Sequence, residues 1–175
     1  MNNPDMRPLN AALMEAVDFI QAEGWDRPAT LFALVPSALI ADAIELDETA
    51  NPLSLVVQED IPEHIRPGSE ELGEFIATVR WPQGVVGAIL AQEITFLNSA
   101  EGDGATPRAA RLFSGIISDA TDMPAAGASR SLIQLRPTEA ELEADPFGQD
   151  KVELLGGDEI APGVIATLES TFEED

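Results

Sequence analysis

The chain has almost none of the side chains on which nucleophilic and redox chemistry depend. Its 175 residues include no cysteine and no tyrosine, one histidine, His64, and one lysine, Lys151. Without cysteine there are no disulfides and no thiolate metal sites. His64 lies between prolines in an acidic stretch, where we expect a surface position rather than a catalytic one. This inventory excludes most thiol and imidazole mechanisms.

Basic residues are also scarce. Nine lysines and arginines face 32 acidic residues, which gives a net charge of -23. Nucleic acids and anionic membranes are bound through cationic surfaces, so we exclude both as partners. Nearly half of this charge falls in residues 138–175, an acidic C-terminal flank that we expect to be solvated. The acidity indicates either an ordinary solubility surface or adaptation to high salt, where self-repulsion is screened.

Long hydrophobic runs are absent. The longest uncharged stretch, Pro28–Ala41, holds 14 residues and is too short to cross a bilayer. Charged residues at positions 5, 7, 15 and 18 interrupt the apolar core that a secretion signal needs. We therefore expect a cytoplasmic protein. A hydrophobic fraction of 45% in a chain of this length predicts one domain over residues 1–175.

The hydrophobic spacing predicts a mixture of helices and strands. Apolar residues recur at helical spacing in four segments, 4–23, 37–46, 69–79 and 162–172. Strand patterns occupy residues 29–35, 53–58, 84–97, 111–119 and 130–136. The stretch from Phe75 to Trp81 also alternates, so a strand beginning there is an alternative to the third helix.

The order of these elements predicts the fold class. Three strands follow one another late in the chain, which favours an α+β fold with a mainly antiparallel sheet packed by several helices over a doubly wound one. The last two strands form a predicted hairpin from Arg111 to Arg136. This apolar hairpin is a candidate edge or interface.

Two pairs of arginine and tryptophan mark a candidate ligand site. Trp25 and Arg27 stand at a helix-to-strand junction, and Arg80 and Trp81 precede the long strand that carries Glu93. Guanidinium groups bind anions through a fork of donors, and indole rings cover cations and aromatic groups. These five residues would form a pocket for an anionic or aromatic ligand. The alternative is that the tryptophans fill the core while the arginines anchor turns.

Known catalytic and metal-binding patterns are missing. The chain has no nucleophile elbow, phosphate-binding loop or dinucleotide fingerprint, and Ser114 falls within a predicted strand. The tract Glu101–Gly104 has carboxylates and glycines without the spacing of a calcium loop. We therefore predict no catalytic residues, no metal site and no cofactor.

Several sequence blocks resemble a known family. They are W-D-R-P-A-T-L-F-A-L-V-P at 25–36, W-P at 81–82, V-V-G-A-I-L-A-Q-E at 85–93, R-L-F-S-G-I at 111–116 and P-G-V-I-A-T-L-E-S-T-F at 162–172. Together they resemble a family of uncharacterised actinobacterial proteins over residues 25–172. The resemblance implies a cytoplasmic actinobacterial origin and carries no activity with it. It favours the ordinary acidic surface over salt adaptation.

Two functions of different classes follow. The first is a non-enzymatic binding or protein-interaction domain, with a homodimer as the expected assembly. The alternative is a small-molecule binder or enzyme that uses the Arg/Trp/Glu pocket for an anionic ligand. The narrow inventory of reactive groups favours the first.

Overall fold

The computed structural model describes residues 5–24, 29–36, 53–58, 65, 70–79, 81, 84–96, 108–119, 125–135, 143–144, 154–157 and 162–172. Three helices and six strands lie in these ranges. In chain order they are α1 (Arg7–Glu23), β1 (Thr30–Pro36), β2 (Leu53–Gln58), α3 (Glu70–Ala77), β3 (Gly87–Phe96), β4 (Arg108–Ile117), β5 (Ser129–Leu135), β6 (Leu154–Gly157) and α5 (Pro162–Ser170).

The strands form a single sheet in the order β2-β1-β3-β4-β5-β6, and each neighbouring pair is antiparallel. This confirms the predicted α+β class with a mainly antiparallel sheet. The five predicted strands are present, with boundaries that agree within three residues. Strand β6 was not predicted. Its four residues, Leu-Leu-Gly-Gly, carry little intrinsic strand preference, so its existence depends on pairing with β5.

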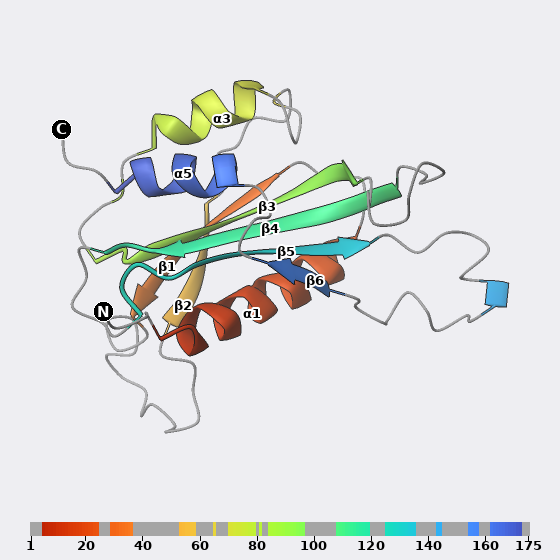
Figure 1. Cartoon of the computed structure of the whole chain (residues 1–175), viewed down its shortest axis with the longest axis horizontal. Helices are drawn as coiled ribbons and strands as arrows, with labels where there is room; N and C mark the ends of the chain where they lie inside the picture. The colour runs from red at the N-terminus through yellow and green to blue at the C-terminus, as the bar shows by residue number, and fades with distance from the viewer. Residues whose placement is uncertain are drawn as a thin grey trace.

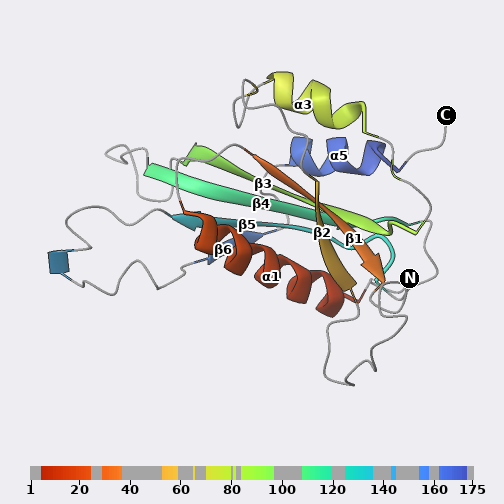
Figure 2. The same cartoon turned by 180° about the vertical axis from the view of Figure 1, so that it is seen from behind.

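Helices cover both faces of the sheet (Figure 1). Helix α1 crosses one face, and α5 lies on the other with α3 packed beside it. The reverse view shows the same layers, with α1 in front of the strands (Figure 2). The architecture is therefore three layers, with the sheet in the middle and a hydrophobic core on each side of it.

Helix α1 forms because its apolar residues repeat at intervals of three and four. Leu9, Leu13 and Val17 are buried against the sheet, and this stripe drives the helix onto it. The helix ends where predicted, at Gly24, whose backbone N–H donates to the carbonyl of Ile20 at 3.1 Å. In the part of the chain that the structure describes, no helix is long and apolar enough to span a membrane.

Strand β4 shows how one sheet serves two cores. Phe113 and Ile117 belong to the cluster that packs on α1, whereas Ile116 belongs to the cluster around α5 and α3. Successive side chains of a strand point to opposite faces, so β4 is buried on both sides. The predicted edge role of the hairpin Arg111–Arg136 is wrong. Strand β4 lies between β3 and β5, and β6 pairs with the outer side of β5.

Residues 70–77 are helical, which decides between the two alternatives for this segment. Leu72 and Ile76 are buried one helical turn apart in the core cluster that also contains Leu168 of α5, and the following strand begins only at Gly87. The predicted helix at 37–46 lies outside the described residues.

Gly87, the first residue of β3, lies very close to the backbone of β4. A Cβ at this position would collide with the carbonyl oxygen of Ile116 and would lie 3.0 Å from Cδ1 of Leu34. The obstacle is backbone and cannot rotate away. Gly73 on α3 is the opposite case, because a Cβ there would have no atom within 4 Å.

We therefore expect opposite effects from two glycine-to-alanine changes. Gly87→Ala should lower the free energy of unfolding by about 1–3 kcal/mol, since β3 and β4 must separate. Gly73→Ala should raise it by up to about 1 kcal/mol, because alanine has the better helix propensity. Urea denaturation followed by circular dichroism measures both. Equal midpoints for the two variants would contradict the close approach of β3 and β4.

Candidate functional site

The structure describes two of the five predicted site residues. Trp81 is half-buried beside α5, and Glu93 is half-buried on β3. Glu93 stands opposite Arg111 in the strand register, and Arg111 faces α1. Trp81 packs with the cluster on the other side of the sheet. The structure thus does not bring Trp81 and Glu93 together.

The other three predicted residues, Trp25, Arg27 and Arg80, lie outside the described residues. Whether these three residues form a ligand pocket, with Trp81 or with Glu93, therefore stays a prediction. The candidate calcium tract Glu101–Gly104 and His64 also lie outside them. In the described ranges, no group of three or more His, Cys, Asp or Glu side chains is arranged to hold a metal ion.

Trp81 connects the segment before β3 to the residues that follow α5. Its indole Nε1 donates to Oγ1 of Thr171 at 2.8 Å, and that hydroxyl donates to the carbonyl of Leu168 at 2.6 Å. The indole also stacks on Phe172, with ring centroids 6.0 Å apart and an interplanar angle of 24°. The aromatic ring of Phe172 is therefore fixed in place by Trp81.

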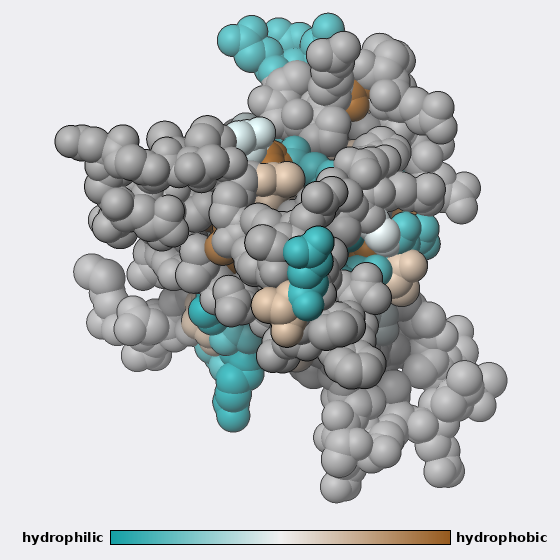
Figure 3. Space-filling model, turned by 90° about the vertical axis from the view of Figure 1, so that its right-hand side faces the viewer, coloured by the Kyte–Doolittle hydropathy of each residue, from teal (hydrophilic) through white to brown (hydrophobic). Residues whose placement is uncertain are grey.

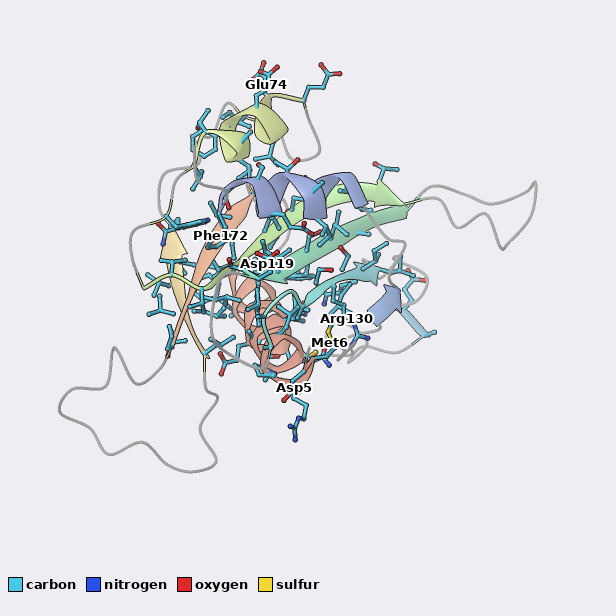
Figure 4. All side chains as sticks on the ribbon, turned by 60° about the vertical axis from the view of Figure 1, so that its left-hand side comes forward. Asp5, Met6, Glu74, Asp119, Arg130 and Phe172 are labelled. Atoms are coloured by element: carbon cyan, nitrogen blue, oxygen red, sulfur yellow. The ribbon has the colours of Figure 1, made fainter. Side chains whose placement is uncertain are left out.

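A cavity of about 230 Å³ opens next to Phe172. It lies between the end of β4, the connection into β5 and the C-terminal end of α5. Figure 4 shows two of its lining residues, Asp119 and Phe172, near one another. Residues from all three elements form its wall, chiefly Ile116, Ile117, Asp119, Gly127, Glu169 and Phe172.

Backbone hydrogen bonds hold this wall in position. The N–H of Ile117 donates to the carbonyl of Ala128 at 2.8 Å, and the N–H of Gly127 donates to the carbonyl of Ile117 at 3.0 Å. Ser118 donates its N–H to Val86 at 2.7 Å. Asp119 follows directly, so its backbone is anchored to the sheet. Gly127 has a φ of +82°, a conformation that glycine adopts without strain.

The described charges around the cavity are negative. Asp119 and Glu169 are exposed carboxylates on different elements, and no described lining residue is basic. The last turn of α5 has no basic residue to offset the partial negative charge of a helix C-terminus. The cavity therefore suits a positively charged group.

A second polar cluster lies on the opposite face of the sheet, under α1. Nη1 of Arg111 donates to Oε1 of Gln21 at 2.8 Å and to Oε1 of Gln134 at 3.0 Å. Nε2 of Gln134 also donates to Gln21, at 2.9 Å. Arg111 is only 1% exposed, so this cluster is closed to a ligand. Its position between helix and sheet indicates a structural role.

The sequence pattern did not single out the residues of the cavity. Asp119 and Glu169 are 50 positions apart and become neighbours only because α5 returns to the end of β4. The one local signal is Phe172, the last residue of the predicted helical segment 162–172. Trp81 was a predicted site residue, and it contacts the cavity indirectly, through Phe172.

The pairing of Trp81 with Thr171 can be measured by a double-mutant cycle. Trp81→Phe keeps an aromatic ring but removes the indole donor, and Thr171→Val removes the acceptor. We expect the two changes to be non-additive by about 1 kcal/mol in the free energy of unfolding, the value of one hydrogen bond. Urea denaturation of the two single variants and the double variant gives this number. Strict additivity would show that the bond contributes nothing.

Comparison with known proteins yields one match. A family model described as PPA1309-like protein matches residues 9–173. Neither the curated proteins nor the solved structures that were searched contain a match to the chain. The actinobacterial origin implied by the sequence blocks stays a prediction. Because the match extends over nearly all of its residues, the chain belongs to the PPA1309-like protein family.

Proposed function

We propose that this protein is a non-enzymatic interaction domain that pairs with a second copy of itself through strand β2. The observation that carries the proposal is the uncharged outer edge that β2 gives to the sheet. Strand β2 is the outermost strand on its side, and no strand in the described ranges pairs with its outer edge.

Strand β2 lacks the devices that normally protect a sheet edge. Its sequence, Leu-Ser-Leu-Val-Val-Gln, has no charge and no proline in a chain with 32 acidic residues. Val56 and Val57 point to opposite faces and are 39% and 38% exposed. Edge strands in soluble proteins are usually blunted by charge, proline or a bulge, because an unprotected edge pairs with another chain.

The side chain of Phe19, on α1, adds to the exposed apolar surface beside β2. Phe19 is 40% exposed, and its ring meets that of Phe32 edge-on, with centroids 5.6 Å apart. Phe32 lies opposite Val57 in the strand register. Phe19, Val56 and Val57, together with the backbone of β2, are called the β2 edge surface below.

The side of the molecule seen in Figure 3 shows little continuous hydrophobic surface among the described residues. On the side of the molecule seen in Figure 3, the described hydrophobic residues form small areas separated by other atoms. That side offers no broad apolar patch among the described residues. Compared with that side, the β2 edge surface is the better-supported interface.

Charge favours a second copy over a basic partner. A basic peptide would bind best against carboxylates, and the described residues of β2 carry none. Two copies, each with a net charge of -23, repel one another except where charges are absent. An uncharged strand that pairs antiparallel with its own copy gives a symmetric dimer and a continuous sheet.

This arrangement predicts a dimer that tightens with salt. Raising the sodium chloride concentration from about 50 to about 500 mM should lower the dissociation constant of the dimer, because screening weakens the repulsion between the two copies. Sedimentation equilibrium over a range of protein concentrations measures this constant. An interface built on opposite charges would weaken under the same change.

A pair of charge-matched variants tests the location of the interface. Val57→Glu places a carboxylate on the β2 edge surface, and we expect at least a tenfold weaker dimer. Met14→Glu adds the same charge to α1 at a residue that is 43% exposed, and it should leave the dissociation constant within about twofold. Circular dichroism confirms that both variants are folded. A chain that stays monomeric at every concentration, or equal effects of both variants, would refute the proposal.

A further inference from the structure

We infer that the second copy pairs with β2 in one register, with Val56 of both copies on the two-fold axis of the dimer. This register rests on the proposed function, the homodimer through β2, and it adds the residues that meet there. Two features of β2 determine it, namely the direction of its backbone groups and the side chains on each of its faces.

The backbone groups of β2 alternate between the neighbouring strand β1 and the outer edge of the sheet. In an antiparallel sheet the N–H and C=O of one residue point to one side of the strand, and those of the next residue point to the other. The carbonyl of Leu34 in β1 accepts from the N–H of Val86 at 2.8 Å, so it points toward β3 and away from β2. Its neighbour Ala33 points the other way and pairs with Val56. The groups of Val56 therefore point to β1, and those of its two neighbours point to the outer edge.

This alternation limits the registers that a second copy can take. The outward groups belong to Leu53, Leu55 and Val57, and Pro36, which has no N–H to donate, stands opposite Leu53 as the alternation requires. Two copies exchange backbone hydrogen bonds only where an outward residue of one stands opposite an outward residue of the other. In a symmetric pair this places the two-fold axis at a residue and never between two residues.

The side chains on the face away from α1 decide at which residue the axis lies. This face carries a valine between two polar residues, in the order Ser54, Val56 and Gln58. With the axis at Val56, the two valines meet and Ser54 stands opposite Gln58 of the second copy. The Ser54 hydroxyl can then donate to Oε1 of Gln58, whose Nε2 donates to the carbonyl of Val56 at 3.2 Å. An axis at Leu55 or Val57 would instead place Val56 opposite one of the polar residues, and an axis nearer either end would pair fewer residues.

The face toward α1 agrees with the same register. With the axis at Val56, Leu55 of one copy stands opposite Val57 of the other, so apolar side chains meet here as well. Leu55 is half-buried against the core cluster under α1, and Val57 is 38% exposed in the single chain. Pairing thus covers the exposed valine with a leucine that the core already holds. The axis is perpendicular to the sheet, so both α1 helices lie on one face and the two six-stranded sheets become one.

Single cysteines test the register, because the chain has no cysteine of its own. A disulfide needs Cα atoms about 4.4–6.8 Å apart, and opposite residues that exchange no backbone bonds lie about 4.5 Å apart. Val56→Cys should therefore form a covalent dimer on mild oxidation at least about tenfold faster than Val57→Cys. Val57 is the matched control, since it is also a valine of nearly equal exposure, but its copy lies on the diagonal, about 7–8 Å away. Non-reducing gel electrophoresis follows both reactions, and circular dichroism confirms that both variants are folded.

A charge exchange gives a second measurement that needs no oxidation. Val56→Glu alone and Val56→Lys alone place like charges opposite one another on the axis, and each should weaken the dimer about tenfold. An equimolar mixture of the two variants should form a mixed dimer at least about fivefold tighter than either variant alone, because glutamate then faces lysine. The same exchange at Val57 should restore less, since the two charges lie on the diagonal. Sedimentation equilibrium measures each dissociation constant.

The failure of this register and the failure of the proposed dimer give different results. A chain that sediments as a dimer, but cross-links faster through Val57→Cys or Leu55→Cys than through Val56→Cys, would overturn the register and leave the homodimer in place. A dimer in which none of the three cysteines cross-links, and in which the mixture of Val56 variants is no tighter than either alone, would do the same. A chain that stays monomeric at every concentration would overturn both.

Discussion

The layered structure depends on how one buried guanidinium is accommodated. Arg111 lies in the middle of the sheet, on β4, with α1 above it. A charge removed from water is stable only if polar partners surround it, and Gln21 and Gln134 supply two of these from α1 and β5. If α1 moved along the sheet or rotated, Arg111 would lose its hydrogen bond to Gln21 and its charge would be buried among apolar side chains. Hydrophobic packing attaches α1 to the sheet, and this triangle sets its register.

A second contact on the same face supports this reading. Arg130 on β5 donates from Nη1 to Oδ1 of Asn10 at 2.8 Å. Asn10 lies near the N-terminal end of α1, whereas Gln21 lies near its C-terminal end. Two arginines on neighbouring strands thus hold the helix at both of its ends. Because directional bonds of this kind discriminate between near-equivalent hydrophobic packings, they add specificity more than net stability.

Local patterns were enough to predict most of the elements. Helix α1 and strand β2 follow from the spacing of their own apolar residues, and the late run of strands indicated the antiparallel sheet. Three features were beyond such reasoning. Strand β6 exists through its pairing with β5, the burial of Arg111 depends on glutamines far away in the sequence, and the cavity forms where α5 meets the end of β4. Each is a product of contacts between distant segments, which periodicity does not encode.

The position of α5 has a consequence for how the chain is made. Leu168 lies in one cluster with Leu31 of β1, Ile76 of α3 and Leu90 of β3, so the last helix completes the core on one whole face of the sheet. During synthesis the strands emerge from the ribosome before α5, so this face of the sheet lacks that helix until residues 162–170 have been made. This layer of the core is therefore completed after the sheet has been made, and the sheet without α5 is the species that a chaperone would meet.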